Sequence, residues 1–125
     1  MNFNNILIGS ENPEALVEYY TKLFGEPGFQ DGGYAGWQIG SGFVSIGPHS
    51  EVHGKNAHPG RFLWNIETSG VHGEFAKLKA AGAIVIREPY EFEGMPGSAI
   101  ATLADPDDNY FQLTTPYESA GEGAA

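Results

Sequence analysis

This chain of 125 residues contains no cysteine. The absence excludes disulfide bonds, thiolate nucleophiles, and zinc or iron–sulfur sites built on cysteine. Basic residues are scarce as well, because 6 Lys and Arg stand against 16 Asp and Glu, for a formal net charge of -10. Such a surface repels nucleic-acid backbones and anionic lipids, so neither is an expected partner, and it attracts cationic ligands weakly.

Long apolar runs are also missing. No stretch approaches the ~20 residues that a membrane-spanning helix needs, and the N-terminus lacks the basic and apolar segments of a signal peptide. We therefore expect a soluble cytoplasmic protein with no membrane contact. The small and polar residues 118–125 are expected to form a flexible tail.

Glycine, in contrast, is abundant. The chain has 18 glycines and 8 prolines, which favour many turns and short elements. Its hydrophobic content of 41% is enough for one domain with a core of ordinary size. The composition favours a single β-rich or α+β domain, which we place over residues 1–117.

Two helices are indicated by apolar residues at 3–4 spacing. The first runs from Pro13 to Phe24, with Asn12 as its predicted N-cap and Gly25 as its end. The second opens at residues 70–73 and ends at Gly82. Apolar alternation and β-branched residues predict strands at 3–8, around 29, and at 34–39, 43–46, 62–68, 84–86, 98–103 and 110–115, with loops at 47–60 and 88–97.

The order of a strand, a helix and further strands occurs twice. An offset of 58 residues superposes Ile6 on Trp64, and an offset of 67 superposes 43–46 on 110–113. We interpret the chain as two βαβββ modules, about 3–49 and about 61–116, forming a curled mixed sheet around a cleft. The alternation of side chains along the strands predicts that the cleft is lined by Asn5, Leu7, Ser45, Leu63, Asn65, Tyr110 and Gln112.

A turn of five residues, Asp105-Pro106-Asp107-Asp108-Asn109, precedes the last strand. It is predicted to be tight, because proline fixes φ and the Asp and Asn side chains bond their own backbone. Gln112 lies in the middle of the strand that follows, on the same side as Tyr110. The sequence alone leaves three partners open for its amide: a metal, a ligand or water.

These segments resemble the vicinal oxygen chelate superfamily, the glyoxalase/bleomycin resistance/dioxygenase group. The resemblance spans residues 3–116 and is carried by three motifs: the end of the first helix at 19–25, the second helix at 75–83, and the turn at 105–109. Asp108 stands where the family usually has glycine. The resemblance implies the two-module fold and a homodimer, and an open eight-stranded sheet also leaves edges for a second copy to cover.

Metal-using members of the superfamily hold a divalent ion with four ligands, usually His and Glu, one from each of four strands. The matching residues here are Asn5, Ser45, Leu63 and Gln112. Two amides, a hydroxyl and a leucine supply neither the carboxylates nor the imidazoles that such ions prefer. The resemblance thus predicts no metal and no cofactor, and it argues against the superfamily's enediolate chelation.

The preferred interpretation is a metal-independent small-molecule binding protein with a cationic or neutral organic ligand in an aromatic and amide-lined cleft. Trp37 and Met95 join the seven cleft residues as candidate ligand contacts. Met95 lies at the tip of a glycine- and proline-rich loop, where an apolar residue often covers a site. Trp37 is a candidate apolar wall, although its glycine-flanked strand is equally typical of the core.

A divalent-metal lyase, isomerase or dioxygenase remains an alternative if its ligands lie elsewhere. The loop at 47–60 holds three histidines, His49, His53 and His58. Prolines and glycines in and around this segment argue against a helix that would bring them together. A solvated loop with incidental histidines is the expectation we prefer.

A metal-free lyase or epimerase is a further alternative, because a buried glutamate can act as a general base. The loop after the predicted strand at 84–86 offers Glu88, Glu91 and Glu93. A solvated acidic loop is the interpretation that we prefer for these residues. The sequence does not decide whether the protein is an enzyme.

Overall fold

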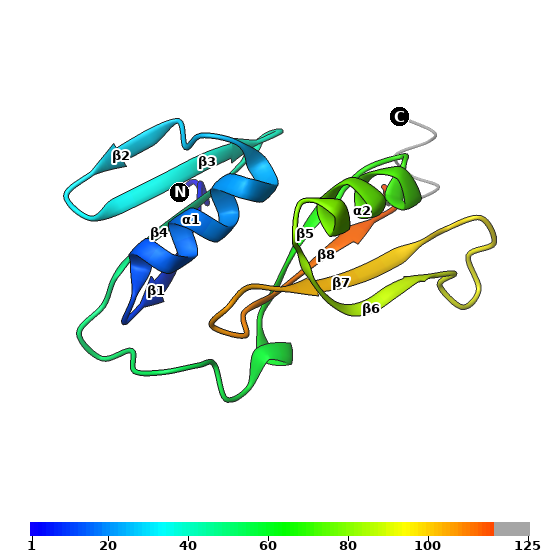
Figure 1. The fold of residues 1–125 in the computed structure, drawn as a ribbon. Coiled ribbons are helices and arrows are strands. Elements are labelled where there is room, and N and C mark those ends of the chain that lie inside the picture. The colour runs from blue at the N-terminus through cyan, green and yellow to red at the C-terminus, as the bar shows by residue number, and fades with distance from the viewer. Residues whose placement is uncertain (117–125) are drawn as a thin grey trace.

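The computed structural model describes residues 1–116; the predicted flexible tail, 118–125, lies outside them. Two modules follow one another along the chain (Figure 1). None of the helices in this described part is long and apolar enough to cross a membrane. The first module contains β1 (Ile6–Ser10), α1 (Pro13–Phe24), β2 (Phe29–Asp31), β3 (Tyr34–Ile39) and β4 (Gly42–Pro48); after a 3-10 turn, Pro59–Arg61, the second contains β5 (Leu63–Glu67), α2 (Val71–Ala80), β6 (Ile84–Tyr90), β7 (Ile100–Ala104) and β8 (Tyr110–Thr114).

Each module forms its own four-stranded mixed sheet, so the predicted α+β class with two βαβββ modules is confirmed. Sheet A has the strand order β1-β4-β3-β2, and sheet B has the order β5-β8-β7-β6. In both sheets the first pair is parallel and the others are antiparallel. Ile6 pairs with Val44 and Trp64 pairs with Phe111, and all four side chains belong to the core, as the two sequence offsets predict.

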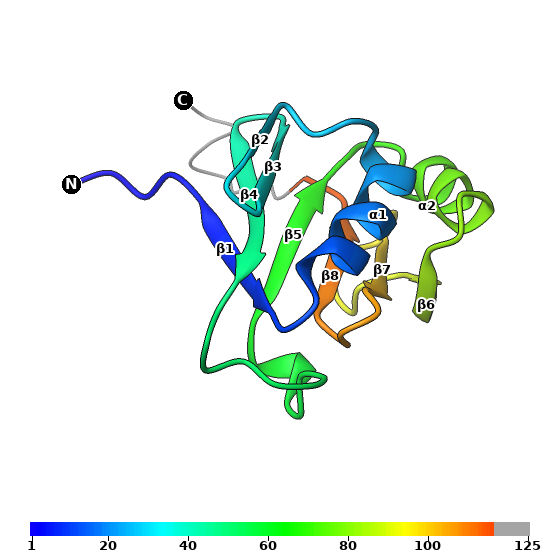
Figure 2. The same ribbon diagram turned by 60° about the vertical axis from the view of Figure 1, so that its left-hand side comes forward.

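Helix α1 packs between the two sheets (Figure 2). Its Tyr20 ring lies 6.0 Å from the Trp37 ring of sheet A and 6.1 Å from the rings of Trp64 and Phe111 in sheet B. Each such pair contributes about 0.5–1.5 kcal/mol beyond the burial of its apolar area. The helix-bearing faces of both sheets therefore meet at α1, and their helix-free faces point away from each other.

The two ends of helix α1 agree only in part with the ends predicted from sequence. Gly25 ends the helix with a φ of 87°, a left-handed conformation that glycine adopts without strain. Asn12 occupies the N-cap position as predicted, but its side chain makes no capping hydrogen bond. Its backbone N–H instead donates to Ser10 Oγ over 3.0 Å, because Ser10 ends the preceding strand directly beside the helix start.

The second half of sheet B corrects one predicted boundary. The strand predicted at 84–86 continues to Tyr90, so the loop predicted at 88–97 begins three residues later than expected. Two shifts in register, between Val85 and Arg87 and between Arg87 and Tyr90, allow the strand to continue. Pro89 is tolerated because β6 is an edge strand, where a missing N–H donor costs no ladder bond.

Candidate functional site

The turn at 105–109 binds the two modules together through a buried carboxylate. Asp105 is completely buried, and its Oδ2 accepts a hydrogen bond from the Tyr20 hydroxyl of α1 over 2.7 Å. Its Oδ1 accepts from the backbone N–H groups of Asp107 and Asn109, at 2.8 and 2.9 Å, and the Asn109 amide donates to it as well. Asp107 in turn accepts from Ser10 Oγ over 2.7 Å. We call this turn, residues 105–109, the clamp, because its hydrogen bonds join the second module to the first.

Burial changes the pKa values of two side chains at this clamp, Asp105 and Tyr20. Loss of contact with water raises the pKa of Asp105, and the donated hydrogen bonds offset part of that rise. Burial and the nearby Asp105 charge raise the pKa of the Tyr20 hydroxyl well above its usual value. Tyr20 therefore stays protonated and donates at neutral pH. A carboxylate so enclosed and so fully bonded acts in structure rather than as an acid or base toward a substrate.

The helix-free face of sheet A, called face A, is apolar and partly aromatic. It carries Leu7 of β1 and Ser45 of β4 side by side, together with the rings of Phe43 and Tyr34. Each ring rests on a glycine of the neighbouring strand. A Cβ atom built on Gly36 would lie 2.4 Å from Phe43 Cζ, and one built on Gly47 would lie 2.1 Å from Tyr34 Cδ1. The two glycines let both rings lie flat on the sheet.

The helix-free face of sheet B, called face B, is richer in polar groups. Asn65, Gln112 and Thr102 stand in register on three neighbouring strands, and Gln112 Nε2 donates to Thr102 Oγ1 over 3.1 Å. Leu63 and Tyr110 form the next row. Gln112 thus has a side-chain partner on its own sheet, and its amide oxygen lies on a face that no other element of residues 1–116 covers.

The seven residues predicted to line one cleft are divided among different surfaces, so a single chain does not enclose that cleft. Leu7 and Ser45 lie on face A, and Leu63, Tyr110 and Gln112 lie on face B. Asn65 also lies on face B, whereas Asn5 precedes β1 and lines the groove between the modules together with Asn65. The cause is α1, which fills the angle between the sheets and turns their helix-free faces outward.

The two other predicted contacts lie apart from these faces. Trp37 is buried in the core, and its Nε1–H donates to the carbonyl oxygen of Gly25 over 2.8 Å, so packing rather than ligand contact accounts for it. Met95 is exposed in the loop between β6 and β7.

A groove of about 650 Å³ runs along the seam between the modules, and we call it the seam groove. The start of β1, the turn between β3 and β4, and strand β5 form its walls. Trp64 lies in one wall, and its indole nitrogen is buried without a hydrogen-bond partner in the described part of the chain. The groove is lined by Phe3, Asn4, Asn5, Ile6, Ile39, Gly40, Ser41, Gly42, Phe43, Val44, Trp64, Asn65, Ile66, Glu67 and Thr114.

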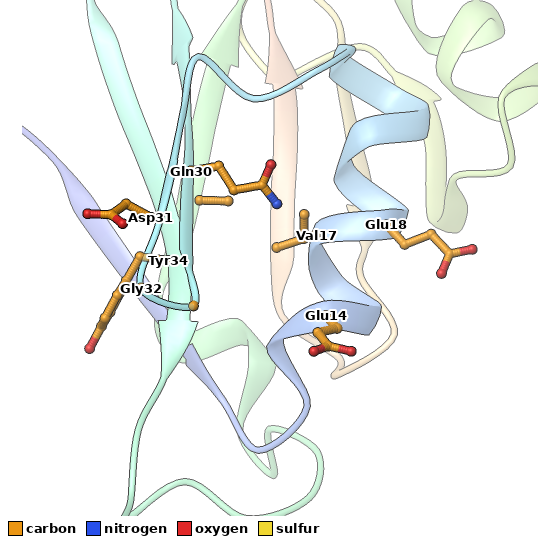
Figure 3. Close-up of a pocket in the computed structure, with 9 residues that line it drawn as sticks. Glu14, Val17, Glu18, Gln30, Asp31, Gly32 and Tyr34 are labelled. Atoms are coloured by element: carbon orange, nitrogen blue, oxygen red, sulfur yellow. The ribbon is translucent and has the colours of Figure 1, made fainter.

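A second, smaller hollow of about 370 Å³ lies between α1 and the β2–β3 hairpin (Figure 3). The Gln30 side chain points toward Val17 of the helix, whereas Asp31 and Tyr34 point away from the hollow. Glu18 also points outward to solvent. Gln30 and Glu14, which also lines the hollow, do not make up the set of convergent polar groups that fixes a ligand.

The loop histidines do not converge. His53 Nδ1 lies 3.1 Å from Glu11 Oε2, and this hydrogen bond lowers the pKa of the Glu11 carboxyl. His49 Nδ1 accepts from the backbone N–H of Glu51 over 3.1 Å. Within residues 1–116 no group of three or more His, Asp or Glu side chains is arranged to hold a metal ion.

The three candidate glutamate bases are all exposed to solvent. Glu88 lies 3.8 Å from Lys79 Nζ, and Glu91 accepts from the backbone N–H of Gly97 over 3.0 Å. They lack the burial that commonly raises the pKa of a catalytic glutamate toward neutral. The acidic segment therefore has the solvated character that the sequence favoured.

Comparison with known proteins identifies the family. The family model described as a glyoxalase-like domain matches residues 5–114. The chain belongs to this glyoxalase-like family. The match is consistent with the vicinal oxygen chelate superfamily that the helix and turn motifs resemble. Comparison with curated protein sequences found no significant match.

Solved structures show the same fold at low identity. A glyoxalase/bleomycin resistance protein/dioxygenase family enzyme from Burkholderia phytofirmans PsJN is 22% identical, with a TM-score of 0.68 over 90% of this chain and 96% of its own. A glyoxalase-related enzyme from Fulvimarina pelagi is 19% identical, with a TM-score of 0.71 over 92% and 88%. A bleomycin-binding protein complexed with bleomycin is 18% identical, with a TM-score of 0.69 over 94% and 100%. At these identities the likeness defines the fold alone.

Three features of the site escaped sequence reasoning. The buried bond between Tyr20 and Asp105 joins residues that are 85 positions apart, so no local pattern could reveal it. The position of Trp64 beside the seam groove depends on how the modules pack. The rings on face A had a usable signal, because a glycine opposite or diagonal to an aromatic residue in paired strands is often covered by its ring.

Proposed function

We propose that this glyoxalase-like protein binds a small organic ligand without a metal, in a cleft formed between two copies of the chain. The observation that carries the proposal is the pair of uncovered sheet faces with complementary content. Face A offers flat aromatic and aliphatic surface, and face B offers amides and hydroxyls in register. Ligand sites in proteins typically combine an apolar wall with a few oriented polar groups.

A homodimer brings these faces together. Leu7 on face A is 50% exposed and Leu63 on face B is 38% exposed, so each face leaves aliphatic surface that a second copy could cover. A two-fold axis that sets face A of one copy against face B of the other repeats the same contact twice. The dimer then holds two equivalent clefts, each built from Leu7, Ser45, Phe43 and Tyr34 of one chain and Leu63, Tyr110 and Gln112 of the other.

Metal independence rests on the side chains at the four positions where superfamily members usually carry ligands. Asn5, Ser45, Leu63 and Gln112 carry no charge and no ring nitrogen. Pairing two copies adds only the same four residue types to each cleft. Hard and borderline divalent ions bind weakly to such a set in competition with water.

The charge of the chain favours a cationic or neutral ligand. With a net charge of -10, the dimer surrounds each cleft with negative potential that attracts cations at low salt. Gln112 offers both a donor and an acceptor to such a ligand. The related fold of the bleomycin-binding protein makes bleomycin, together with other cationic antibiotics, the appropriate first probe. The absence of cysteine suits a reducing compartment, and we propose the cytoplasm.

Calorimetric titration with bleomycin and a panel of cationic antibiotics tests the proposal, alongside light scattering to measure the oligomeric state. We expect a dimer, saturable heat that weakens as salt is added, and a raised Tm. Gln112→Leu should weaken binding, whereas Gln30→Leu, a matched change on the other side of sheet A, should not. A monomer that gives neither heat nor a thermal shift with any probe contradicts the proposal.

A further inference from the structure

Among residues 1–116, Arg87 is the one basic side chain at a strand position of face B. It lies on the edge strand β6 and pairs with Thr102, so it extends the polar row that contains Gln112 and Thr102 to the edge of the sheet. Its neighbour Glu88 lies 3.8 Å from Lys79 Nζ of α2, on the helix-bearing side. The alternation of side chains along a strand then directs Arg87 to the helix-free side, in agreement with its pairing.

The guanidinium group of Arg87 is oriented by a neighbouring ring. Its central carbon lies 3.6 Å from the centre of the Tyr90 ring, and Tyr90 pairs with Ile100 one row further along the same face. Stacking on an aromatic ring fixes the plane of a guanidinium group while its N–H donors stay available. The ion pairs within residues 1–116 all involve other basic residues, although Asp and Glu outnumber Lys and Arg by 16 to 6. An oriented arginine without a carboxylate partner, in so acidic a chain, indicates that its acceptor is a ligand.

The opposite edge of face B carries a negative charge. Glu67 lies on β5 and pairs with Thr114, in the same row of side chains as Tyr90. It is exposed, and it makes no ion pair in the described part of the chain. Neighbouring strands lie about 4.8 Å apart, so the three steps from β5 to β6 separate the two charged edges by about 14 Å. Face B thus presents one cationic and one anionic group with hydrogen-bonding side chains between them.

We propose that Arg87 determines the ligand class of the cleft between two copies: a zwitterion whose carboxylate binds Arg87 and whose ammonium group lies toward Glu67. This inference rests on the proposed function, because face A of the second copy supplies the apolar wall over these groups. The planar N–H donors of arginine match the two oxygens of a carboxylate. A ligand with a carboxylate alone is disfavoured, because the net charge of -10 repels anions. A zwitterion offers the carboxylate and stays neutral overall.

Calorimetric titration of the native protein with three biphenyl compounds tests this inference. The compounds differ only in the groups at their two ends: aminomethyl and carboxylate in the zwitterion, aminomethyl and carboxamide in the cation, and methyl and carboxylate in the anion. We expect the zwitterion to bind about tenfold more tightly than the cation or the anion, the factor that one charge-assisted hydrogen bond provides.

Three variants show whether this preference comes from Arg87. Arg87→Gln should reduce the preference for the zwitterion over the cation to less than about twofold. Arg87→Lys keeps the charge but loses the planar donors, so it should retain part of the preference. Lys77→Gln makes the same change of charge on α2, beside Glu74, and should leave the preference at its native value. Both positions are exposed, so the variants should fold.

The outcomes separate this inference from the proposed function. Equal binding of the zwitterion and the cation by the native protein overturns the inference, while binding of the cation leaves the cleft standing. A monomer that binds none of the three compounds contradicts the proposed function and the inference with it. The inference is also overturned if Arg87→Gln keeps the preference and instead weakens the dimer. Arg87 would then pair with an acidic residue of the second copy, such as Asp31 at the edge of face A.

Discussion

The change Tyr20→Phe removes one oxygen from the core and with it the bond between α1 and the clamp of the second module. The Tyr20 hydroxyl donates to Asp105 Oδ2 over 2.7 Å, and both residues are buried. The ring contacts with Phe24, Trp37 and Trp64 remain in the variant. The loss in the free energy of unfolding therefore measures the hydrogen bond rather than the effect of a cavity.

The expected loss follows from the charge of the acceptor. A hydrogen bond to a charged group contributes about 1.5–3 kcal/mol to the free energy of unfolding. The two backbone donors and the Asn109 amide still hold the carboxylate, so the cost stays within this range. For a chain of this length we take roughly 4 °C per kcal/mol, so Tm should fall by about 6–12 °C.

The loss in the free energy of unfolding caused by Tyr20→Phe should also depend on pH. Burial raises the folded-state pKa of Asp105 above the ordinary value of 3.8. The stability linked to this carboxyl is therefore fully present below its unfolded pKa and is lost as the pH rises through the folded pKa. Without the Tyr20 donor the folded pKa rises further. The deficit of Tyr20→Phe should be largest at pH 7 and should shrink as the pH falls through the Asp105 pKa.

Urea unfolding of the native protein and the variant at a series of pH values measures these quantities. Tyr110→Phe is the matched control, because Tyr110 is half-buried on face B and its hydroxyl makes no hydrogen bond within residues 1–116. It should change the free energy of unfolding by less than about 0.5 kcal/mol. A deficit for Tyr20→Phe no larger than that of the control at pH 7, or one that grows toward acid, would refute the reasoning.

Three further outcomes are expected. Gly47→Ala places a Cβ 2.1 Å from Tyr34 Cδ1 and should cost about 1–3 kcal/mol in urea unfolding, whereas Gly28→Ala, with open space around it, should cost far less. Asp108 has a φ of 62°, so Asp108→Gly should keep or raise the free energy of unfolding by up to about 1 kcal/mol, while Asp108→Ala should lower it. Added Ni²⁺, Zn²⁺ or Mn²⁺ should leave the Tm unchanged relative to chelator-treated protein, and a saturable rise with any of them would contradict a metal-free cleft.

The strands and their faces could be predicted from sequence because side-chain alternation is a local property. Four paired side chains point to the core, as the sequence offsets of 58 and 67 between the two modules predict. They are Ile6 and Val44 in sheet A and Trp64 and Phe111 in sheet B. The positive φ of Asp108 also explains why the family usually has glycine at this position.

The placement of α1 between the sheets could not be predicted in the same way. The spacing of its apolar residues shows only that Tyr20 belongs to a buried stripe, and not that this stripe meets two sheets at once. A single chain therefore does not bring the predicted cleft residues to one surface, although those that lie within strands are on the helix-free faces. Trp37 shows the same limit, because alternation fits a wall or a core and only its bond to Gly25 O decides.

Subunit complementation tests most directly whether the ligand cleft forms between copies. Ser45→Arg blocks face A, and Gln112→Arg blocks face B. Each variant alone forms a dimer with both clefts blocked, and neither should bind bleomycin in calorimetric titration. After subunit exchange, each mixed dimer holds one cleft with two native faces, so binding should return at one site per mixed dimer. A mixture as inactive as its parents would contradict a cleft shared between two chains.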